Sequence, residues 1–368
     1  MEVTQGAPFE SFGLSEATMR AIRNKHYTVS TPVQAGCIPP MLAGKDVIAK
    51  APTGTGKTFA FGIPIIEHIE PGSEETEAVI LAPTRELAMQ ITAELRDLCV
   101  YLPGVRIVCL YGGAPIGKQI DALKRRPQIV VATPGRLSDH MKRRTVNLKS
   151  VQTVVLDEAD RMLDMGFIHD VRRIAEKLPE KRQTLMFSAT MPPEVEKLAM
   201  DLLHEPESVK VDPVSSTVKK IDQCLYYVDK ANKKHLLAKI LRDPDVENAL
   251  VFSRTKHGAD RIVRDLKREG IDAVAIHGDK SQNARQAALT AFKTGECKVL
   301  VATDIAARGI DIAGLSHVIN YDMPMEPEAY VHRIGRTGRA GRDGTAISFC
   351  CICLLYTSPS PRDRSLSR

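Results

Sequence analysis

Short apolar segments alternate along this chain with longer segments whose apolar residues recur at helical spacing. In the first half the apolar segments are residues 46–50, 78–82, 106–110, 129–132, 153–156 and 184–187. Each segment fits a short buried strand, and the stretches between them fit helices. Strands that alternate with helices predict a parallel sheet with helices on both faces.

The alternation is interrupted once and then returns. Residues 211–220 are polar and contain Pro and Ser, which is typical of a linker. Strands are then expected at residues 222–228, 248–252, 273–276, 298–302, 317–320 and 345–350, and helices at 230–243, 256–269, 281–294 and 326–335. The pattern predicts an α/β protein with two domains of similar build, over residues 1–208 and 221–353, joined by a linker over residues 209–220.

The first 45 residues precede this alternation and are expected to be helical after a leading loop. Ser15 can cap a helix that ends near Lys25, and Pro32 suits the start of the next helix.

Composition narrows the class of protein. The 368 residues suffice for two hydrophobic cores, and 43% hydrophobic with 26% charged residues is ordinary for a soluble globular protein. The net charge of +6 permits a nucleic-acid partner without requiring one. No apolar run is long enough to span a membrane, and no secretory signal is present. The eight cysteines include the C-x-x-C spacing Cys350–Cys353, which lacks a second pair or a nearby histidine, so we expect buried free thiols in a reducing cytoplasm.

A glycine-containing loop follows the first expected strand and precedes a helix predicted over residues 59–69. Gly54 and Gly56 permit a tight turn whose N–H groups can approach phosphates, Lys57 can reach the β and γ phosphates, and Thr58 can bind Mg²⁺. An ordinary strand-to-helix turn is the alternative, since Ala51 stands where the strict pattern has Gly. The expected nucleotide contacts of this phosphate-binding loop are Ala51, Pro52, Thr53, Gly54, Thr55, Gly56, Lys57 and Thr58.

An acidic segment, Asp157-Glu-Ala-Asp160, follows the apolar strand at residues 153–156. Acidic side chains at the carboxyl edge of a parallel sheet lie where ligands bind in α/β proteins. Asp157 is placed to hold Mg²⁺ directly or through water, and Glu158 to orient an attacking water. A solvated acidic helix N-terminus is the alternative interpretation.

Together the motifs resemble those of the DEAD-box RNA helicases, from about Phe9 to Cys351. The resemblance rests on an ordered series: Gln34, 51–58, 83–90, Gly112-Gly113, 133–136, 157–160, 188–190, 250–255, 282–285, 302–311 and 332–339. It implies two RecA-like domains, ATP and Mg²⁺ as cofactors, and RNA as the partner.

The resemblance also implies how adenine is read. Gln34 corresponds to the residue that hydrogen-bonds to the edge of the base, and Phe9 to an aromatic that stacks on it. His26 and Ser30 stand where the family usually has Gly and Pro, and we expect adenine specificity to survive that departure.

Further catalytic residues are carried over from the family. Ser188 and Thr190 link the acidic motif, including Asp160, to the moving domain, and His332 and Arg333 contact both segments. Arg336 and Arg339 correspond to arginine fingers, and Asp311 lies near them and the ribose. Read alone, the three arginines recur every three residues and also fit one solvated face of a helix.

RNA contacts are expected to come from loops and to reach sugar and phosphate, so that base sequence is not read and the 2′-hydroxyl favours RNA. The candidates are Pro83, Thr84, Arg85, Gly112, Gly113, Thr133, Pro134, Arg136, Arg254, Gln282, Arg285, Thr303 and Gly309. The basic runs Lys124–Arg126 and Lys142–Arg144 are expected to be solvated faces rather than specific sites.

The function expected from this resemblance is RNA-stimulated ATP hydrolysis coupled to local, non-processive unwinding of RNA duplexes. An ATP-gated RNA clamp or annealing scaffold uses the same residues and stays open as an alternative, and a DNA helicase of the same superfamily is a second. We expect a cytoplasmic monomer that resembles the short bacterial members, without a membrane partner; ribosome assembly and RNA degradation are both open as its pathway.

Residues 354–368 have no apolar period and are rich in Ser, Pro and Arg. They fit either a disordered basic tail that touches RNA or sequence foreign to the gene. We favour the second interpretation, which would leave the second domain truncated.

Overall fold

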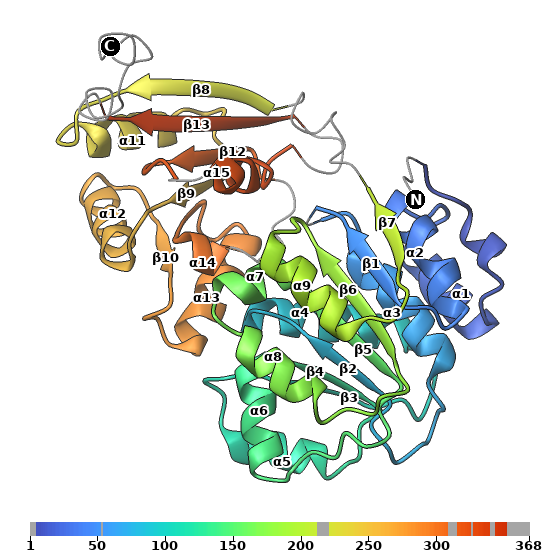
Figure 1. The fold of residues 1–368 in the computed structure, drawn as a ribbon. Helices are drawn as coiled ribbons and strands as arrows, with labels where there is room; N and C mark the ends of the chain where they lie inside the picture. Colours follow the sequence, from blue (N-terminus) through green and yellow to red (C-terminus); the bar gives the residue numbers. More distant parts are fainter. Residues whose placement is uncertain are drawn as a thin grey trace, which may run out of the picture. The chain divides into compact units, whose positions relative to one another are not determined.

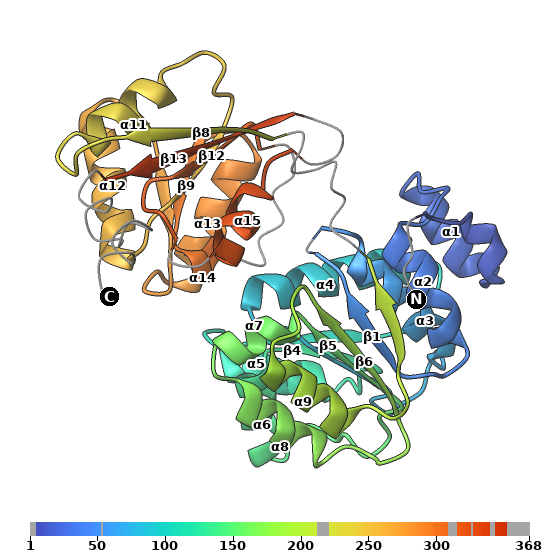
Figure 2. The ribbon, with the colours of Figure 1, turned by 45° about the horizontal axis from the view of Figure 1, so that its top comes forward.

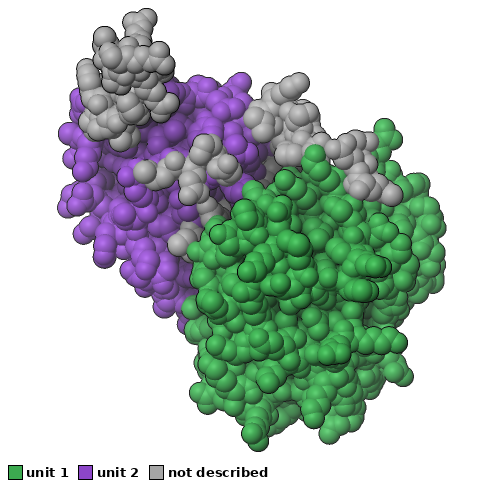
Figure 3. Space-filling model, in the orientation of Figure 1, with its two compact units in different colours: residues 1–213 green, residues 214–368 purple. Residues whose placement is uncertain are grey.

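The chain forms two compact units in a computed structural model, over residues 1–213 and 214–368 (Figure 3). The structure describes residues 5–52, 54–211, 221–307, 315–324, 327–338 and 343–351. No helix within these ranges combines the length and apolarity that crossing a membrane requires.

The first unit is built on a seven-stranded parallel sheet in the order β3-β4-β2-β5-β6-β1-β7 (Figure 1). Its strands are β1 (Val47–Lys50), β2 (Ala78–Leu81), β3 (Ile107–Leu110), β4 (Ile129–Ala132), β5 (Thr153–Asp157), β6 (Gln183–Ser188) and β7 (Glu207–Lys210). Its helices are η1 (Phe9–Phe12), α1 (Glu16–Asn24), α2 (Pro32–Leu42), α3 (Lys57–His68), α4 (Arg85–Leu98), α5 (Ile116–Leu123), α6 (Pro134–Lys142), α7 (Ala159–Asp164), α8 (Ile168–Ala175) and α9 (Pro193–Leu202).

Two hydrophobic clusters cover the two faces of this sheet, because neighbouring residues of a strand point to opposite sides. In β2, Ile80 joins the cluster formed with α1 to α4, while Val79 and Leu81 join the cluster formed with α5 to α9. Figures 1 and 2 show helices on both faces. The predicted α/β class with a helix-covered parallel sheet is confirmed.

The N-terminal segment follows the predicted capping. Ser15 precedes α1 and accepts a hydrogen bond from the Thr18 amide, and Pro32 is the first residue of α2. The Thr31 amide donates to Gln34 Oε1 at 2.9 Å, so Gln34 takes part in the capping of its own helix.

Strand β7 was not predicted. It pairs with β1, with Val47 opposite Glu207, and therefore extends the first sheet to Lys210, beyond the expected domain end at residue 208. Only Val209 of this edge strand is buried, so the segment lacks the apolar run that revealed the central strands. The rest of the expected linker, residues 212–220, lies outside the described residues.

A buried carboxylate fastens this edge of the sheet. Asp46 Oδ1 accepts a hydrogen bond from the Thr184 amide and Oδ2 accepts one from the His204 amide, both at 2.7 Å. The Asp46 side chain thus joins the start of β1 to the start of β6 and to the segment that leads into β7.

Replacing Asp46 with alanine should therefore destabilise the first unit by about 2–4 kcal/mol, because the buried Thr184 amide and the partly buried His204 amide lose a charged acceptor. Urea unfolding followed by circular dichroism measures the loss. Asp121→Ala, which removes an exposed carboxylate paired only with Lys124, is the control and should leave the unfolding midpoint unchanged. Equal midpoints for the two variants would contradict the role given to Asp46.

The second unit repeats the design with a six-stranded parallel sheet in the order β10-β11-β9-β12-β13-β8. Its strands are β8 (Ile221–Tyr227), β9 (Ala249–Phe252), β10 (Val274–Ile276), β11 (Val299–Ala302), β12 (His317–Asn320) and β13 (Gly344–Cys350). Its helices are α11 (Lys233–Leu241), α12 (Lys256–Arg268), α13 (Gln282–Lys293), α14 (Asp304–Ala307) and α15 (Pro327–Ile334). In β9, Val251 joins the core with α11 and α12, and Leu250 and Phe252 join the core with α13 and α14.

Strand β8 departs from the expectation of buried thiols. It forms an edge of the second sheet, and its residues after Ile221 are exposed, Cys224 among them. Cys37 and Cys297 are buried as expected, and the seven cysteines in the described ranges are free. Cys353 and residues 354–368 lie outside those ranges.

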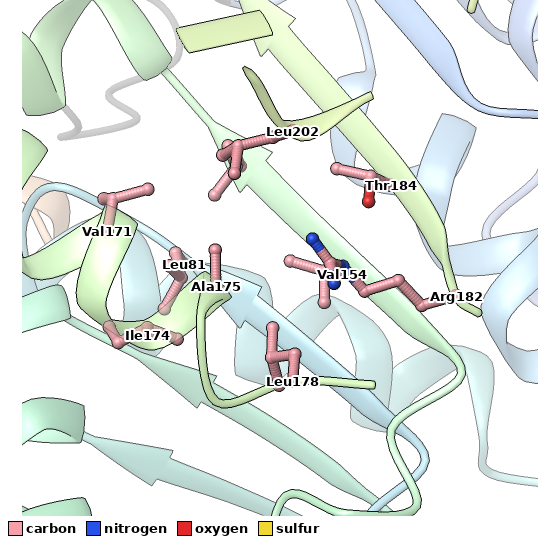
Figure 4. Close-up of a pocket in the computed structure, with 10 residues that line it drawn as sticks. Leu81, Val154, Val171, Ile174, Ala175, Leu178, Arg182, Thr184 and Leu202 are labelled. Carbon is pink, nitrogen blue, oxygen red and sulfur yellow. The ribbon is translucent and has the colours of Figure 1, made fainter. Parts of the chain in front are cut away.

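A small closed cavity lies under α8 in the first unit (Figure 4). Its volume is about 10 Å³, and its walls are mostly aliphatic, with Leu81, Val154 and Val171 among them. Such a space holds at most one water molecule and offers few polar partners, so it is a packing defect rather than a ligand site.

Candidate nucleotide and RNA sites

The phosphate-binding loop joins β1 to α3 and places two glycines in the left-handed region. Gly54 has φ +84° and Gly56 has φ +87°. A Cβ on Gly56 would also lie 2.6 Å from Gln34 Nε2, so glycine is required there for both conformation and space. Thr55 Oγ1 donates to the Pro52 carbonyl at 2.8 Å and closes the turn, while Thr53 lies outside the described residues. Ala51 is fully buried and is not among the residues with positive φ, so alanine is accommodated where the strict pattern has Gly.

Lys57 is the first residue of α3, and its ammonium group is buried without a hydrogen-bond partner among the described residues. Its Nζ lies 3.7 Å from Asp157 Oδ1, and the two side chains are 6% and 3% exposed. A buried ammonium group that lacks acceptors is costly. Phosphate oxygens would supply those acceptors, so the residues present fit a nucleoside triphosphate.

Asp157 ends β5 within the same site. Burial raises the pKa of this carboxyl to about 6, against the opposing effect of the nearby Lys57 charge, while the neighbouring Glu158 raises it further. Thr58 follows Lys57 in the sequence and is also buried. A hydroxyl and a carboxylate suit Mg²⁺, which takes few protein ligands and keeps water or phosphate for the rest.

Glu158 has a left-handed backbone, with φ +54°, between β5 and α7. Its Oε2 accepts a hydrogen bond from Arg161 Nη1 at 2.6 Å, and both side chains are almost fully buried. A non-glycine residue in this region is strained, and such strain concentrates at functional sites. The acidic motif is therefore a rigid buried turn and not the solvated helix end that stood as its alternative.

The third acidic residue binds the segment after β6. Asp160 Oδ2 accepts hydrogen bonds from the amide and the hydroxyl of Thr190, each at 2.8 Å, and the Asp160 amide donates to Ser188 Oγ at 3.1 Å. The Ser188 carbonyl accepts from the Ala51 amide at 3.0 Å. The phosphate-binding loop, the acidic motif and residues 188–190 are thus one hydrogen-bonded assembly.

Gln34 connects this assembly to α2. Its Nε2 donates to the Gly56 carbonyl at 3.0 Å while its Oε1 accepts from Thr31. Each end of the carboxamide retains one further hydrogen-bonding position, which a base edge could use.

Phe9, the residue expected to stack on the base, is buried. Its ring is 1% exposed and packs edge-on against Phe12 at 6.0 Å between centroids, and its stacking on a base stays a prediction. Tyr27 is the exposed aromatic of this region, at 48%, and its ring meets that of Phe59, two residues after Lys57. The sequence signal for Tyr27 was its place beside His26 in the adenine-reading motif, which we did not use.

Two of the expected RNA loops of the first unit meet at one arginine. The Arg85 guanidinium lies so close to Gly113 that a Cβ there would be 2.4 Å from Nη1, and Gly113 has φ +86°. Gly112 lies against the same guanidinium, and Thr84 caps α4 by accepting from the Leu87 amide. Pro83 is buried ahead of this cap.

Arg136 belongs to the third loop, whose Thr133 and Pro134 begin α6 and are buried. Arg136 Nη1 donates to the Ala114 carbonyl at 3.1 Å and to Gln119 Oε1 at 3.2 Å. Gln119 Nε2 in turn donates to the Tyr111 carbonyl. These bonds join the loop at Arg136 to the loop at Gly112 and Gly113.

Behind Gln119 lies a fully buried histidine that the sequence did not single out. His140 Nε2 is 3.1 Å from Gln119 Oε1, an acceptor, so Nε2 carries the proton, and Nδ1 is 2.8 Å from Thr145 Oγ1. Burial, followed by the Arg136 charge, lowers the pKa of His140, which keeps the ring neutral. An isolated Gln and His on amphipathic helices carry no sequence signal for this role.

In the second unit Arg333 binds residues of its own unit. Its guanidinium is 3% exposed and binds Asp304 twice, Nε to Oδ1 at 2.6 Å and Nη2 to Oδ2 at 2.7 Å. Nη1 donates to Asn320 Oδ1 and to the Asp322 carbonyl. Arg333 therefore fastens α15 to the neighbouring elements of its own unit, and its expected contact with the acidic motif stays a prediction.

Arg336 does not continue the helix that carries Arg333. Helix α15 ends at Ile334, and Arg336 lies buried in the turn that follows, while His332 is partly exposed on the helix. Arg339, Asp311 and Gly309 lie outside the described residues, so the expectations placed on them are untested.

The second unit's RNA candidates lie at the ends of its strands. Arg254 follows β9 and is exposed, with its amide donating to Asp322 Oδ2 at 3.0 Å. Gln282 and Arg285 occupy the first turn of α13, after the cap Ser281, and Thr303 follows β11.

Comparison with known proteins bears on these arrangements. The DEAD/DEAH box helicase model matches residues 31–198 and the helicase conserved C-terminal domain model matches residues 232–341. The chain is 48% identical over 364 residues to the DEAD-box ATP-dependent RNA helicase CshA of Bacillus subtilis, covering 98% of this chain and 71% of the relative. It is 48% identical over 341 residues to ATP-dependent RNA helicase CshA of Listeria monocytogenes, covering 93% and 65%.

Solved structures agree with the fold. The Saccharomyces cerevisiae protein Dbp5 bound to RNA and ADP BeF3 is 30% identical with a TM-score of 0.83, covering 94% of this chain and 89% of that one. The DEAD-box helicase Mss116 bound to ssRNA and UDP-BeF is 32% identical with a TM-score of 0.85, covering 99% and 83%. The two units are RecA-like, and the chain belongs to the DEAD-box family of ATP-dependent RNA helicases.

Proposed function

We propose that this chain hydrolyses ATP in response to RNA and uses the cycle to separate short RNA duplexes locally. The observation that carries the proposal is the buried Lys57 ammonium, without a hydrogen-bond partner among the described residues, in one assembly with Asp157 and residues 188–190. The compartment we propose is the cytoplasm, which the free thiols of the described cysteines support.

The chain's own residues divide the work in this proposal. Bound ATP with Mg²⁺ supplies the transferable phosphoryl group and neutralises part of its charge. Lys57 Nζ would donate to the β and γ phosphates, Thr58 and Asp157 would hold the metal ion, and Glu158 would orient the attacking water. Arg336 and Arg339 come from the second unit and act only when ATP and RNA draw the units together, which makes hydrolysis conditional on RNA.

The division of the chain belongs to the same proposal. The first RecA-like domain includes β7 and ends near residue 210, and the second covers residues 221–353. The linker between them permits the domain closure that the arginine fingers require.

An unwinding assay tests the proposal. A labelled RNA duplex with a single-stranded overhang should release its short strand with ATP at a rate well above that without ATP. ATP-dependent RNA binding that persists without strand release above the no-ATP control would establish the clamp instead. Turnover stimulated by DNA as strongly as by RNA would establish the DNA helicase.

The packing of Arg85 on Gly113 supplies a sharper prediction for the RNA site. Gly113→Ala forces the guanidinium away and strains the backbone, so RNA affinity should fall about tenfold, roughly the value of one charge-assisted hydrogen bond to a phosphate. ATP affinity should stay the same, because Gly113 is not part of the phosphate-binding loop. Fluorescence anisotropy with a labelled single strand of RNA measures the affinity for RNA.

Gly117→Ala is the matched control for this prediction. Gly117 lies on α5 with nothing within 4 Å of the added Cβ, so its RNA affinity should equal that of the unmodified chain. Equal RNA affinities for the two variants would show that the contact between Arg85 and Gly113 does not contribute to RNA binding.

A further inference from the structure

Two basic runs that look alike in the sequence have different surroundings in the structure. In Lys124–Arg126, Lys124 pairs with Asp121 and Arg126 pairs with Glu74, so the run is largely neutralised. In Lys142–Arg144, Lys142 and Arg144 line a cavity of about 360 Å³. The residues of both runs are exposed, as expected, and the second run also lines this cavity.

The cavity lies at the C-terminal end of α6, between that helix, the segment that leads to β5, and the end of α8, which packs beside α6 (Figure 1). Five cationic side chains surround it: Lys142, Arg144, Lys149, Arg173 and Lys177. Three apolar side chains form its floor: Met141, Val146 and Leu148. None of the residues that line it is acidic.

The charge of this cavity is only partly compensated. Asp170 pairs with Arg173 at 3.4 Å and accepts from Ser138, and Glu75 accepts from Asn147 at 3.5 Å. The ion pairs recorded within the described ranges include no partner for the other four cations. Like charges around one space repel each other, and a multivalent anion bound between them reduces this repulsion.

Its size and floor limit the anion. A volume of about 360 Å³ falls within the roughly 300–1,000 Å³ of small-molecule sites. Inorganic phosphate would leave the apolar floor bare, and a continuous nucleic-acid strand binds along an open groove of charges rather than in one cavity. A planar, weakly polar group joined to several phosphates matches both the floor and the cationic rim.

We propose that this cavity binds a nucleoside polyphosphate, with its base against Met141 and Leu148 and its phosphates on the surrounding lysines and arginines. The site is separate from the phosphate-binding loop, which lies between β1 and α3. The same chemistry is present in a free nucleotide and in the 5′-triphosphate end of an RNA. The proposal does not depend on the unwinding activity.

The test measures binding of a fluorescent guanosine 5′-triphosphate to the full chain carrying Lys57→Ala, which disables the phosphate-binding loop. Saturable binding of one probe is expected, and adding Lys142→Glu with Arg144→Glu should weaken it at least tenfold. Lys124→Glu with Arg125→Glu makes the same change in charge on the other basic run and should alter the affinity less than twofold. Circular dichroism confirms that each variant is folded.

A second arm separates the two sources of the ligand. A short RNA with a 5′-triphosphate is compared with the same RNA carrying a 5′-hydroxyl. A preference for the triphosphate end that Lys142→Glu with Arg144→Glu removes identifies RNA ends as the ligand, whereas equal RNA affinities with retained nucleotide binding identify a free nucleotide. Absence of saturable probe binding, or equal weakening by both pairs of substitutions, would overturn the proposal.

Discussion

Lys57→Ala should reduce ATP turnover by at least about a thousandfold and should also make the unliganded first unit less stable. Stabilisation of phosphoryl transfer in these sites comes mainly from positioned charge, and Lys57 Nζ is the buried cation of the phosphate-binding loop. The ammonium makes no hydrogen bond among the described residues, but it faces Asp157 Oδ1 at 3.7 Å, so its removal leaves this buried carboxylate without a counter-charge and lowers the free energy of unfolding at neutral pH. RNA-stimulated phosphate release and urea unfolding measure the two quantities.

A second consequence follows at Asp157. Lys57 is the main influence that lowers the pKa of this buried carboxyl, so its loss should raise that pKa further above about 6. A larger fraction of Asp157 is then protonated at neutral pH, and Mg²⁺ affinity should fall together with turnover. Isothermal titration of Mg²⁺ with nucleotide tests this second effect.

Lys233→Ala is the matched control, because Lys233 is an equally buried lysine whose ammonium is satisfied by the Tyr321 carbonyl at 2.6 Å. It should destabilise the second unit by about 1–3 kcal/mol and leave nucleotide affinity at the first unit unchanged. Normal turnover in Lys57→Ala would remove the phosphate-binding loop from the mechanism.

The fold was readable from the sequence where burial imposes an apolar run. All four residues of β2, β4, β9 and β11 are buried, and each of these strands was predicted within a residue or two. Strand β7 was not, because an edge strand needs one buried residue only, and Val209 alone does not form a pattern. What sets β7 in place is a partner far away in sequence, strand β1, together with Asp46.

Within the site, the sequence identified which residues matter better than what they contact. Arg333 was recognised by its motif, but the sequence did not show that its guanidinium binds Asp304 and Asn320 inside its own unit. Phe9 was recognised in the same way, but the sequence did not show that its ring is buried. A motif indicates which residue type stands at a position. The partners of that residue depend on how distant parts of the chain pack together, and the spacing of residues within a motif does not predict that packing.

Glu158→Gln should leave ATP affinity intact, slow turnover by about 10²–10⁴-fold, and hold the chain on RNA. The amide keeps the size of the side chain and can still accept the Arg161 hydrogen bond, but it lacks the charge that orients and polarises a water molecule. If hydrolysis is what allows the RNA-bound state to open, a chain that binds ATP without cleaving it stays closed. Release of labelled RNA after addition of unlabelled competitor measures this directly.

The buried ion pair makes a stability control necessary for this variant. Arg161 loses its counter-charge, so the first unit should become less stable by about 1–3 kcal/mol, and activity must be compared well below its unfolding midpoint. Glu196→Gln, an exposed carboxylate on α9, should change neither turnover nor RNA release. A variant that binds ATP, turns over slowly and still releases RNA as fast as the unmodified chain would show that hydrolysis does not control opening. Unchanged turnover would instead show that Glu158 only supports the turn.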